Sequence, residues 1–343
     1  MKTNFIFFSI LFCSIVCLGQ NDQVNAQTKS VVDTSFIKDI SEKLIIRLNS
    51  DSKIDFYKVN SADAKLELYP NSVLNYSIGV DYKFIGFSIG LPKKWFQSDE
   101  QIRLKGKTSI SDLKFNFFFN KWKQSIYFQR VKGFYVKNYG DFNENWIKDV
   151  DPYLQFPNFD TQRYGGSTSY IFNGNKFSYR SFLQQTQIQL KSVGSFIPAF
   201  SYEYHIKSNK IDGSEKDYNK SLILTPSLSY QYNCVISKSF NLSAGAITGI
   251  GFGYLLKNNS NDDNNWEKSY NYGYNLNLNF QKKNFFAGVQ YLSNNSYEKE
   301  ESTKITNTVN YFNLFLGFRF NAPKWLNKNT EKIENLIYKK EKS

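Results

Sequence analysis

Apolar and polar side chains alternate along most of the chain, most clearly in residues 270–280. There, every second position is Tyr, Leu or Phe, and the positions between are Asn or Gly. A β-strand points successive side chains to opposite faces, so this segment predicts a strand with one apolar and one uncharged polar face. Strands of this kind separate lipid from a polar lumen in transmembrane β-barrels. We therefore expect Asn275 and Asn277 to face the lumen.

The same period of two recurs along the rest of the chain. It predicts about twelve strands of roughly ten residues each, which is the length of a membrane-spanning strand. The count rises to about fourteen if residues 44–59 form an additional hairpin over Ser50, Asp51 and Ser52. The predicted fold class is all-β, an antiparallel transmembrane β-barrel. An even strand count places both ends of the barrel in the periplasm.

The middle of the chain gives a conflict in strand direction. Asn173-Gly174-Asn175 favours a type I′ turn, so residues 167–173 and 176–191 are expected to form a hairpin. With this hairpin, the long loops of the two halves fall on opposite sides of the membrane. These loops are residues 92–105 and 134–166 in the first half, and 207–220, 256–269 and 293–304 in the second. Either one strand is miscounted, or residues 184–195, where the alternation changes phase, contain a break.

Both ends of the chain differ from the alternating region. Residues 1–20 begin with a basic residue and continue as an apolar run, which has the form of a cleaved secretory signal peptide. Residues 21–32 are polar and are expected to be a flexible periplasmic segment, and residues 33–320 hold the barrel. Residues 321–343 form a tail in which Ile333, Leu336 and Ile337 follow helical spacing. The tail is expected to dock on a periplasmic partner or the membrane surface, or to remain a frayed, solvated end.

Charge and cysteine content fit an exported barrel. A net charge of +13 would suggest nucleic acid as a partner of a soluble protein, but export and the scattered basic residues argue against nucleic acid here. Outer-membrane lipid, lipopolysaccharide and anionic solutes are the expected counterparts, and the outer-membrane assembly machinery is an expected partner. After signal cleavage only Cys234 remains, so the exported chain forms no internal disulfide.

His205 is the only histidine and lies on the same predicted strand face as Glu203. A Ser–His pair oriented by a polar group could hydrolyse lipid, but no G-x-S-x-G motif accompanies His205. We therefore expect both side chains to join a polar network in the lumen. A metal site built on His and Cys lacks its ligands, and we expect no metal and no cofactor.

Glycine marks the inner face of another predicted strand. Gly249, Gly251 and Gly253 have the spacing G-x-G-x-G without a following helix, which does not match a phosphate-binding loop. Such small residues leave room for a plug, for bulky facing side chains or for a passing ligand. Arg319, on the last predicted strand, completes the set of expected lumen-lining residues.

Three functions fit these features. The first is passage or binding of small solutes in a polar lumen. The second is a non-conducting structural or adhesion barrel, which bulky inward residues such as Phe118 and Phe315 favour. The third is a membrane-embedded lipid hydrolase that uses His205. We rank the hydrolase last and expect no catalytic residue and no enzyme activity.

Several motifs together resemble a known family. They are Tyr69-Pro70-Asn71, Gly106-Lys107-Thr108, Gln129-Arg130 with Gly133-Phe134-Tyr135, Tyr170-Ile171-Phe172-Asn173 with Lys176-Phe177-Ser178-Tyr179-Arg180, and Lys191-Ser192-Val193-Gly194-Ser195-Phe196. The chain resembles domain of unknown function family 4421 over residues 33–320. The resemblance implies an exported outer-membrane barrel of Gram-negative cells, and it implies no reaction, substrate or catalytic residue.

Overall fold

The computed structural model describes residues 32–60, 65–71, 74–91, 98–119, 121–209, 217–256, 266–300, 303–328 and 330. The chain forms two compact units, of which Val32–Pro323 is the larger. The other unit is described only through residues 324–328 and 330, which are helical. The predicted signal peptide, nearly all of the flexible segment and the helical positions Ile333, Leu336 and Ile337 lie outside the described residues.

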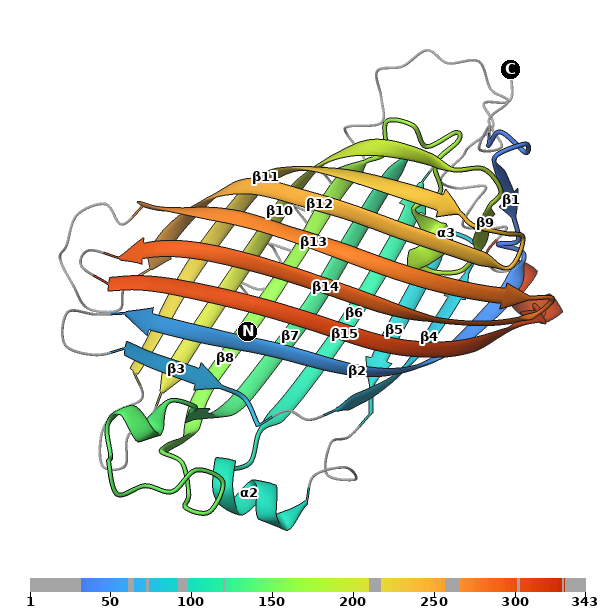
Figure 1. Ribbon diagram of the computed structural model, residues 1–343. Helices are drawn as coiled ribbons and strands as arrows, with labels where there is room; N and C mark the ends of the chain where they lie inside the picture. Colours follow the sequence, from blue (N-terminus) through green and yellow to red (C-terminus); the bar gives the residue numbers. More distant parts are fainter. Residues whose placement is uncertain are drawn as a thin grey trace. The chain divides into compact units, whose positions relative to one another are not determined.

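Twelve antiparallel strands of the larger unit close into one barrel (Figure 1). In ring order they are β2 (Lys43–Asn60), β4 (Asn75–Tyr82), β5 (Ile85–Gly90), β6 (Ser109–Phe119), β7 (Trp122–Val136), β8 (Gln155–Tyr170), β10 (Val193–Asn209), β11 (Asp217–Val235), β12 (Phe240–Leu256), β13 (Trp266–Lys282), β14 (Phe285–Glu300) and β15 (Thr303–Asn321). The ring closes where β15 pairs with β2 from Lys304↔Asn60 to Asn321↔Lys43. The predicted all-β barrel of about twelve strands is confirmed.

A thirteenth strand, β3 (Lys65–Tyr69), joins the sheet at one end only. β2 pairs with β4 along Ile45 to Asp51, and with β3 along Tyr57 to Asn60. The other edge of β3 pairs with the end of β7. At this end β3 therefore replaces β4, β5 and β6 as the link between β2 and β7.

The predicted hairpin over Ser50, Asp51 and Ser52 is wrong, because β2 runs unbroken for 18 residues. The hairpin predicted for residues 167–173 and 176–191 is also wrong. Ser167 to Tyr170 complete β8, and the chain then folds back before β10 begins at Val193. Asn173 and Gly174 do make a turn, with the Gly174 amide bonded to the Ile171 carbonyl, but no strand hairpin comes after it.

The conflict in loop direction disappears because residues 43–60 form a barrel strand, whereas residues 176–191 do not. The short turns β4–β5, β6–β7, β11–β12 and β13–β14 lie at the end where β2 begins and β15 finishes, which we call the turn end. The long connections β5–β6 and β7–β8 lie at the opposite end, which we call the loop end. Residues 293–304, predicted to be a loop, are largely strand.

The two faces of the barrel wall differ as the alternation predicts. Outward Tyr270 and Leu276 are 61% and 49% exposed, whereas inward Asn277 and Asn279 are 5% exposed. At the turn end, the outward rings of Phe240, Phe280, Phe285, Phe318 and Phe320 contact one another in sequence at centroid distances of 5.0–6.4 Å. An apolar outer band edged by aromatic side chains is typical of a membrane-spanning barrel. Among the described residues, no helix is long and apolar enough to cross a membrane.

Short elements cover the two ends of the barrel. At the loop end, α2 (Asp99–Lys105) begins where the Ser98 side chain accepts a hydrogen bond from the Gln101 amide, as an N-cap does. The 3₁₀ turn η2 (Tyr139–Asp141) lies in the β7–β8 connection. At the turn end are α3 (Arg180–Leu183) and a two-stranded sheet of β1 (Ile37–Asp39) and β9 (Gln187–Gln189).

Gly133 offers a test of this backbone. It lies at the β-bulge of β7 with a φ of 92°, and a Cβ atom there would overlap the Lys107 carbonyl oxygen. Gly133→Ala is expected to lower the free energy of unfolding by more than about 1 kcal/mol, because the alanine would be strained as well as crowded. Urea unfolding of the detergent-folded barrel measures the change.

Gly90→Ala is the matched control for Gly133→Ala. A Cβ atom at Gly90 meets nothing within 4 Å, so this variant is expected to unfold close to the wild-type midpoint. Equal midpoints for the two variants would contradict the assigned bulge.

Candidate functional site

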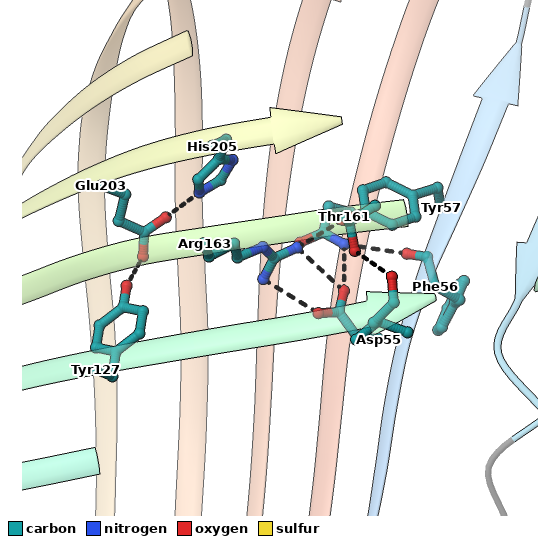
Figure 2. Close-up of polar contacts among 10 residues, drawn as sticks. Asp55, Phe56, Tyr57, Tyr127, Thr161, Arg163, Glu203 and His205 are labelled. Atoms are coloured by element: carbon teal, nitrogen blue, oxygen red, sulfur yellow. Dashed lines mark hydrogen bonds and ion pairs between the residues drawn. The ribbon is translucent and has the colours of Figure 1, made fainter. Parts of the chain in front are cut away.

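Inward side chains from five strands meet in the loop-end half of the barrel. We call this group the lumen network; its members are Asp55 and Tyr57 of β2, Tyr127 of β7, Arg163 of β8, Glu203 and His205 of β10, and Asn307 of β15. Figure 2 shows two sets of contacts, one around Arg163 and one around Glu203, without a dashed line between them. Strands that are not neighbours in the sheet are joined by these contacts, so the network bridges across the interior.

Arg163 is the centre of the first set. Its guanidinium lies 3.1 Å from Asp55, and it donates hydrogen bonds to the Tyr57 hydroxyl at 2.8 Å and to the Asn307 amide oxygen at 3.3 Å. Asn307 in turn donates to Asp55 at 2.8 Å. The Arg163 and Asp55 side chains are only 14% and 6% exposed. A buried charge pair is tolerated when further hydrogen bonds satisfy both partners, which is the arrangement here.

Glu203 is the centre of the second set, and Gly165 of β8 makes this set possible. Gly165 pairs with Tyr127 on one side and with Glu203 on the other. A Cβ atom at Gly165 would lie 2.8 Å from the Tyr127 ring and 3.0 Å from Glu203 Cγ. Because glycine lacks that atom, the Tyr127 hydroxyl reaches across β8 and donates to the Glu203 carboxylate.

His205 completes the second set. Its Nε2 atom lies 2.6 Å from Glu203 Oε2, so the two carboxylate oxygens hold two different neighbours. His205 also pairs in register with Arg163, which places the two sets side by side. Glu203 and His205, both predicted to line the lumen, are in contact with each other, and Glu203 also accepts a hydrogen bond from Tyr127.

Residues 171–192 form a second feature of the interior, which we call the plug segment. It contains α3 and β9, and Figure 1 shows both elements at the turn end of the barrel. Hydrogen bonds join it to inward side chains around the ring. Those donated by the wall include Arg47 to the Leu183 carbonyl (2.7 Å), Gln290 to the Phe182 carbonyl (2.8 Å), Asn233 to the Ser178 carbonyl (2.9 Å) and Arg319 to the Gln185 carbonyl (3.3 Å).

Many side chains of the plug segment are shielded from solvent. Gln184 and Thr186 are 1% and 0% exposed, although they belong to a connection between strands. Phe177 and Phe182 pack with Ile171 and Ile197 in an apolar cluster. Burial also raises the pKa of Tyr179 to about 12, so its hydroxyl stays protonated. The segment therefore lies within the turn end of the barrel, buried against the wall.

β1, which precedes the barrel strands in the chain, pairs with β9 and so holds the plug segment in place. Asp39 of β1 accepts a hydrogen bond from Gln187 of β9 at 3.0 Å. Burial opposes the negative charge of Asp39, but the Arg180 guanidinium and hydrogen bonds from Ser41 and Gln187 outweigh it and hold its pKa below the usual value. The carboxylate is therefore charged at neutral pH and attracted to α3.

The other residues predicted to line the lumen lie outside the lumen network. Asn277 donates to Asn275 at 3.1 Å, and Arg319 lies against the plug segment and over the Phe286 ring. Cβ atoms at Gly249 and Gly251 would overlap neighbouring atoms, so these glycines serve close packing of β12 against its neighbours. Gly253 shares their strand and face.

The sequence interpretation missed the residues that bridge the interior. Asp55, Tyr127 and Arg163 occupy inward positions of their strands, and Arg47 does so beneath the plug segment. The available signal was a charged residue in the inward phase of an alternating strand, since an unpaired charge in that position is costly. This signal identifies Asp55 and Arg163 as inward charged residues, but it does not show which residues they contact.

The fold and interior define a membrane-spanning β-barrel whose lumen is occupied by its own side chains and by one inward-folded connection. The chain belongs to the family described as Domain of unknown function (DUF4421), whose model matches residues 31–320. No curated protein matches the sequence.

Several solved barrels are similar at low identity. The outer membrane protease OmpT of Escherichia coli is 8% identical, with 82% of this chain and 98% of that chain covered and a TM-score of 0.35. The translocator domain of the autotransporter NalP of Neisseria meningitidis is 7% identical, with 93% and 98% covered and a TM-score of 0.38. The beta domain of the Bordetella autotransporter BrkA is 8% identical, with 80% and 98% covered and a TM-score of 0.40.

Replacing Arg163 tests the lumen network. Arg163→Met leaves Asp55 buried without its cation, and it is expected to lower the free energy of unfolding by about 3 kcal/mol. Combining it with Asp55→Asn removes the uncompensated charge and is expected to recover part of that loss. Urea unfolding in detergent measures all three proteins.

Lys58→Met is the control for Arg163→Met. Lys58 is 2.7 Å from Glu67, but the two side chains are 45% and 27% exposed. An exposed pair contributes less than about 1 kcal/mol. A loss for Arg163→Met no larger than that for Lys58→Met would contradict a buried, bridging ion pair.

Proposed function

We propose that this protein is a closed outer-membrane barrel with a structural or adhesive role in the envelope, and that it does not conduct solutes at rest. The observation that carries the proposal is the plug segment. Its backbone accepts hydrogen bonds from β11 and from the neighbouring strands β14, β15 and β2, so two parts of the wall hold it. A passage for solutes would have to cross this segment.

Bulky inward side chains support the same function. Phe315 packs with Ile45 and Phe286 in a buried cluster, and Phe118 is 4% exposed against the ring of Tyr179. Large apolar side chains that fill a lumen contribute to stability and leave less space for water. Such side chains are consistent with a barrel that acts through its wall and loops and not through its lumen.

The orientation of the barrel is inferred from its turns. Outer-membrane barrels have short periplasmic turns and longer external loops. We therefore assign the turn end to the periplasm and the loop end, with α2 and η2, to the cell exterior. In this orientation lipopolysaccharide surrounds the loop end, where envelope or surface partners would bind. We further propose that His205 serves the lumen network and that the protein is not an enzyme.

Gated passage of a small solute is the second candidate. Lys114 of β6 is an inward residue, since it pairs with Tyr127, yet it is exposed to solvent. Water therefore reaches the interior above the plug segment. The plug segment is held by hydrogen bonds to neutral amides and two arginines, so a partner or solute that replaced those bonds could release it.

Replacing residues 171–192 with a short glycine-serine turn tests both candidates. The wild type is expected to give no stepwise conductance in planar bilayers, and the replacement is expected to give steady open channels because the turn end has lost its closure. Heat-dependent gel migration confirms that the variant remains a folded barrel. Open channels in the wild type would contradict the proposal of a closed barrel, and channels that appear only with an added solute would favour gated passage.

A further inference from the structure

A groove of about 520 Å³ runs along the outward face of β12. Its floor is formed by Ala244 and Ala246, and its walls include Tyr230 and Tyr232 of β11, Tyr274 of β13 and Tyr291 of β14. Nearly all of the exposed lining atoms are apolar.

The strand register explains the groove. Ala246 pairs with Tyr230 on one side and with Tyr274 on the other, and Ala244 pairs with Tyr232 and Leu276. Each small residue of β12 therefore lies between two large ones. The result is a depression along β12 with raised sides on both neighbouring strands.

The walls are held open by contacts on their far sides. The ring of Tyr230 packs against Phe196 at 4.9 Å and covers Gly194, both on β10. The ring of Tyr274 lies 5.9 Å from the ring of Tyr291 on β14. Both tyrosines thus have partners directed away from β12, and neither fills the space above Ala244 and Ala246. The groove is preformed, which lowers the entropic cost of binding.

We propose that this groove binds one acyl chain of a phospholipid from the membrane leaflet at the turn end. The face belongs to the apolar outer band of a membrane-spanning barrel, so hydrocarbon is the medium that it meets. Ala244 lies four residues beyond Phe240, the aromatic residue at the start of β12. This spacing corresponds to about 10 Å at the tilt of a barrel strand, which is below the headgroups and inside the hydrocarbon layer.

A narrow apolar groove suits a single chain better than a second protein copy. Its lining comprises nine residues, whereas a stable protein interface uses roughly 20–30 residues on each side. A methylene chain needs no hydrogen-bond partner, and burying it against the alanine floor and tyrosine rings is favourable. The proposal holds whether the lumen is closed or gated, because the groove lies on the outer face.

Lipid retention measured by native mass spectrometry tests the proposal. The full chain is reconstituted in palmitoyl-oleoyl phosphatidylethanolamine vesicles, extracted in mild detergent and weighed. One bound phospholipid per wild-type barrel is expected. The double variant Ala244→Phe/Ala246→Phe fills the groove and is expected to retain about tenfold less lipid, as a loss of about 1.4 kcal/mol would give.

Ala287→Phe is the matched control, because it makes the same change on the outward face of β14 outside the groove. It is expected to retain lipid as the wild type does, and heat-dependent gel migration verifies that each variant is folded. Three results would overturn the proposal: no lipid on the wild type, equal retention by the double variant and the wild type, or equal loss in Ala287→Phe. A wild-type mass of two copies that the double variant reduces to one would also overturn it, in favour of a dimer contact.

Discussion

The pairing of β15 with β2 is the interaction on which the rest of the structure depends. A sheet edge in lipid would leave backbone N–H and C=O groups without partners, and each such group would cost several kilocalories per mole. The ring avoids this cost by joining the first and last long strands over their full lengths, from Lys43 to Asn60 and from Lys304 to Asn321. Closure also fixes which side chains face inward, and so determines what must fill the lumen.

The inward face is filled by complementary pairs of small and large residues. Gly165 admits the contact between Tyr127 and Glu203, and Gly288 lies beneath the ring of Phe315. At the turn end, the plug segment supplies backbone carbonyls to the donors Arg47 and Arg319. Side chains that would be unsatisfied in an empty, dry lumen thereby obtain partners within the chain.

The sequence predicted the wall better than the interior. Alternation along residues 270–280 is a local property, so it correctly assigned Tyr270 to the outside and Asn277 to the inside. The strand count was also correct, although the hairpins proposed at Ser50 and Gly174 were wrong. The turn at Gly174 exists, but the path of the chain beyond it depends on donors from strands far away in the sequence, such as Asn233 and Gln290. Such non-local partners leave no periodic signal.

The interior residues show the same limit of local patterns. Glu203 and His205 lie two positions apart on one strand, so the alternation alone places them on the same face. The cross-barrel partner of Arg163 is Asp55, 108 residues earlier in the chain, and no spacing rule connects them. Gln184 and Gln185 look like loop residues by composition, yet burial in the plug segment gives them a structural role.

Hydrogen–deuterium exchange of the folded barrel tests the closed turn end most directly. Amides of residues 177–190 are expected to exchange slowly, as those of the adjoining strands do, because the segment is buried inside the ring. Exchange of these amides as fast as that of an exposed connection, with the strands still protected, would contradict closure by the plug segment.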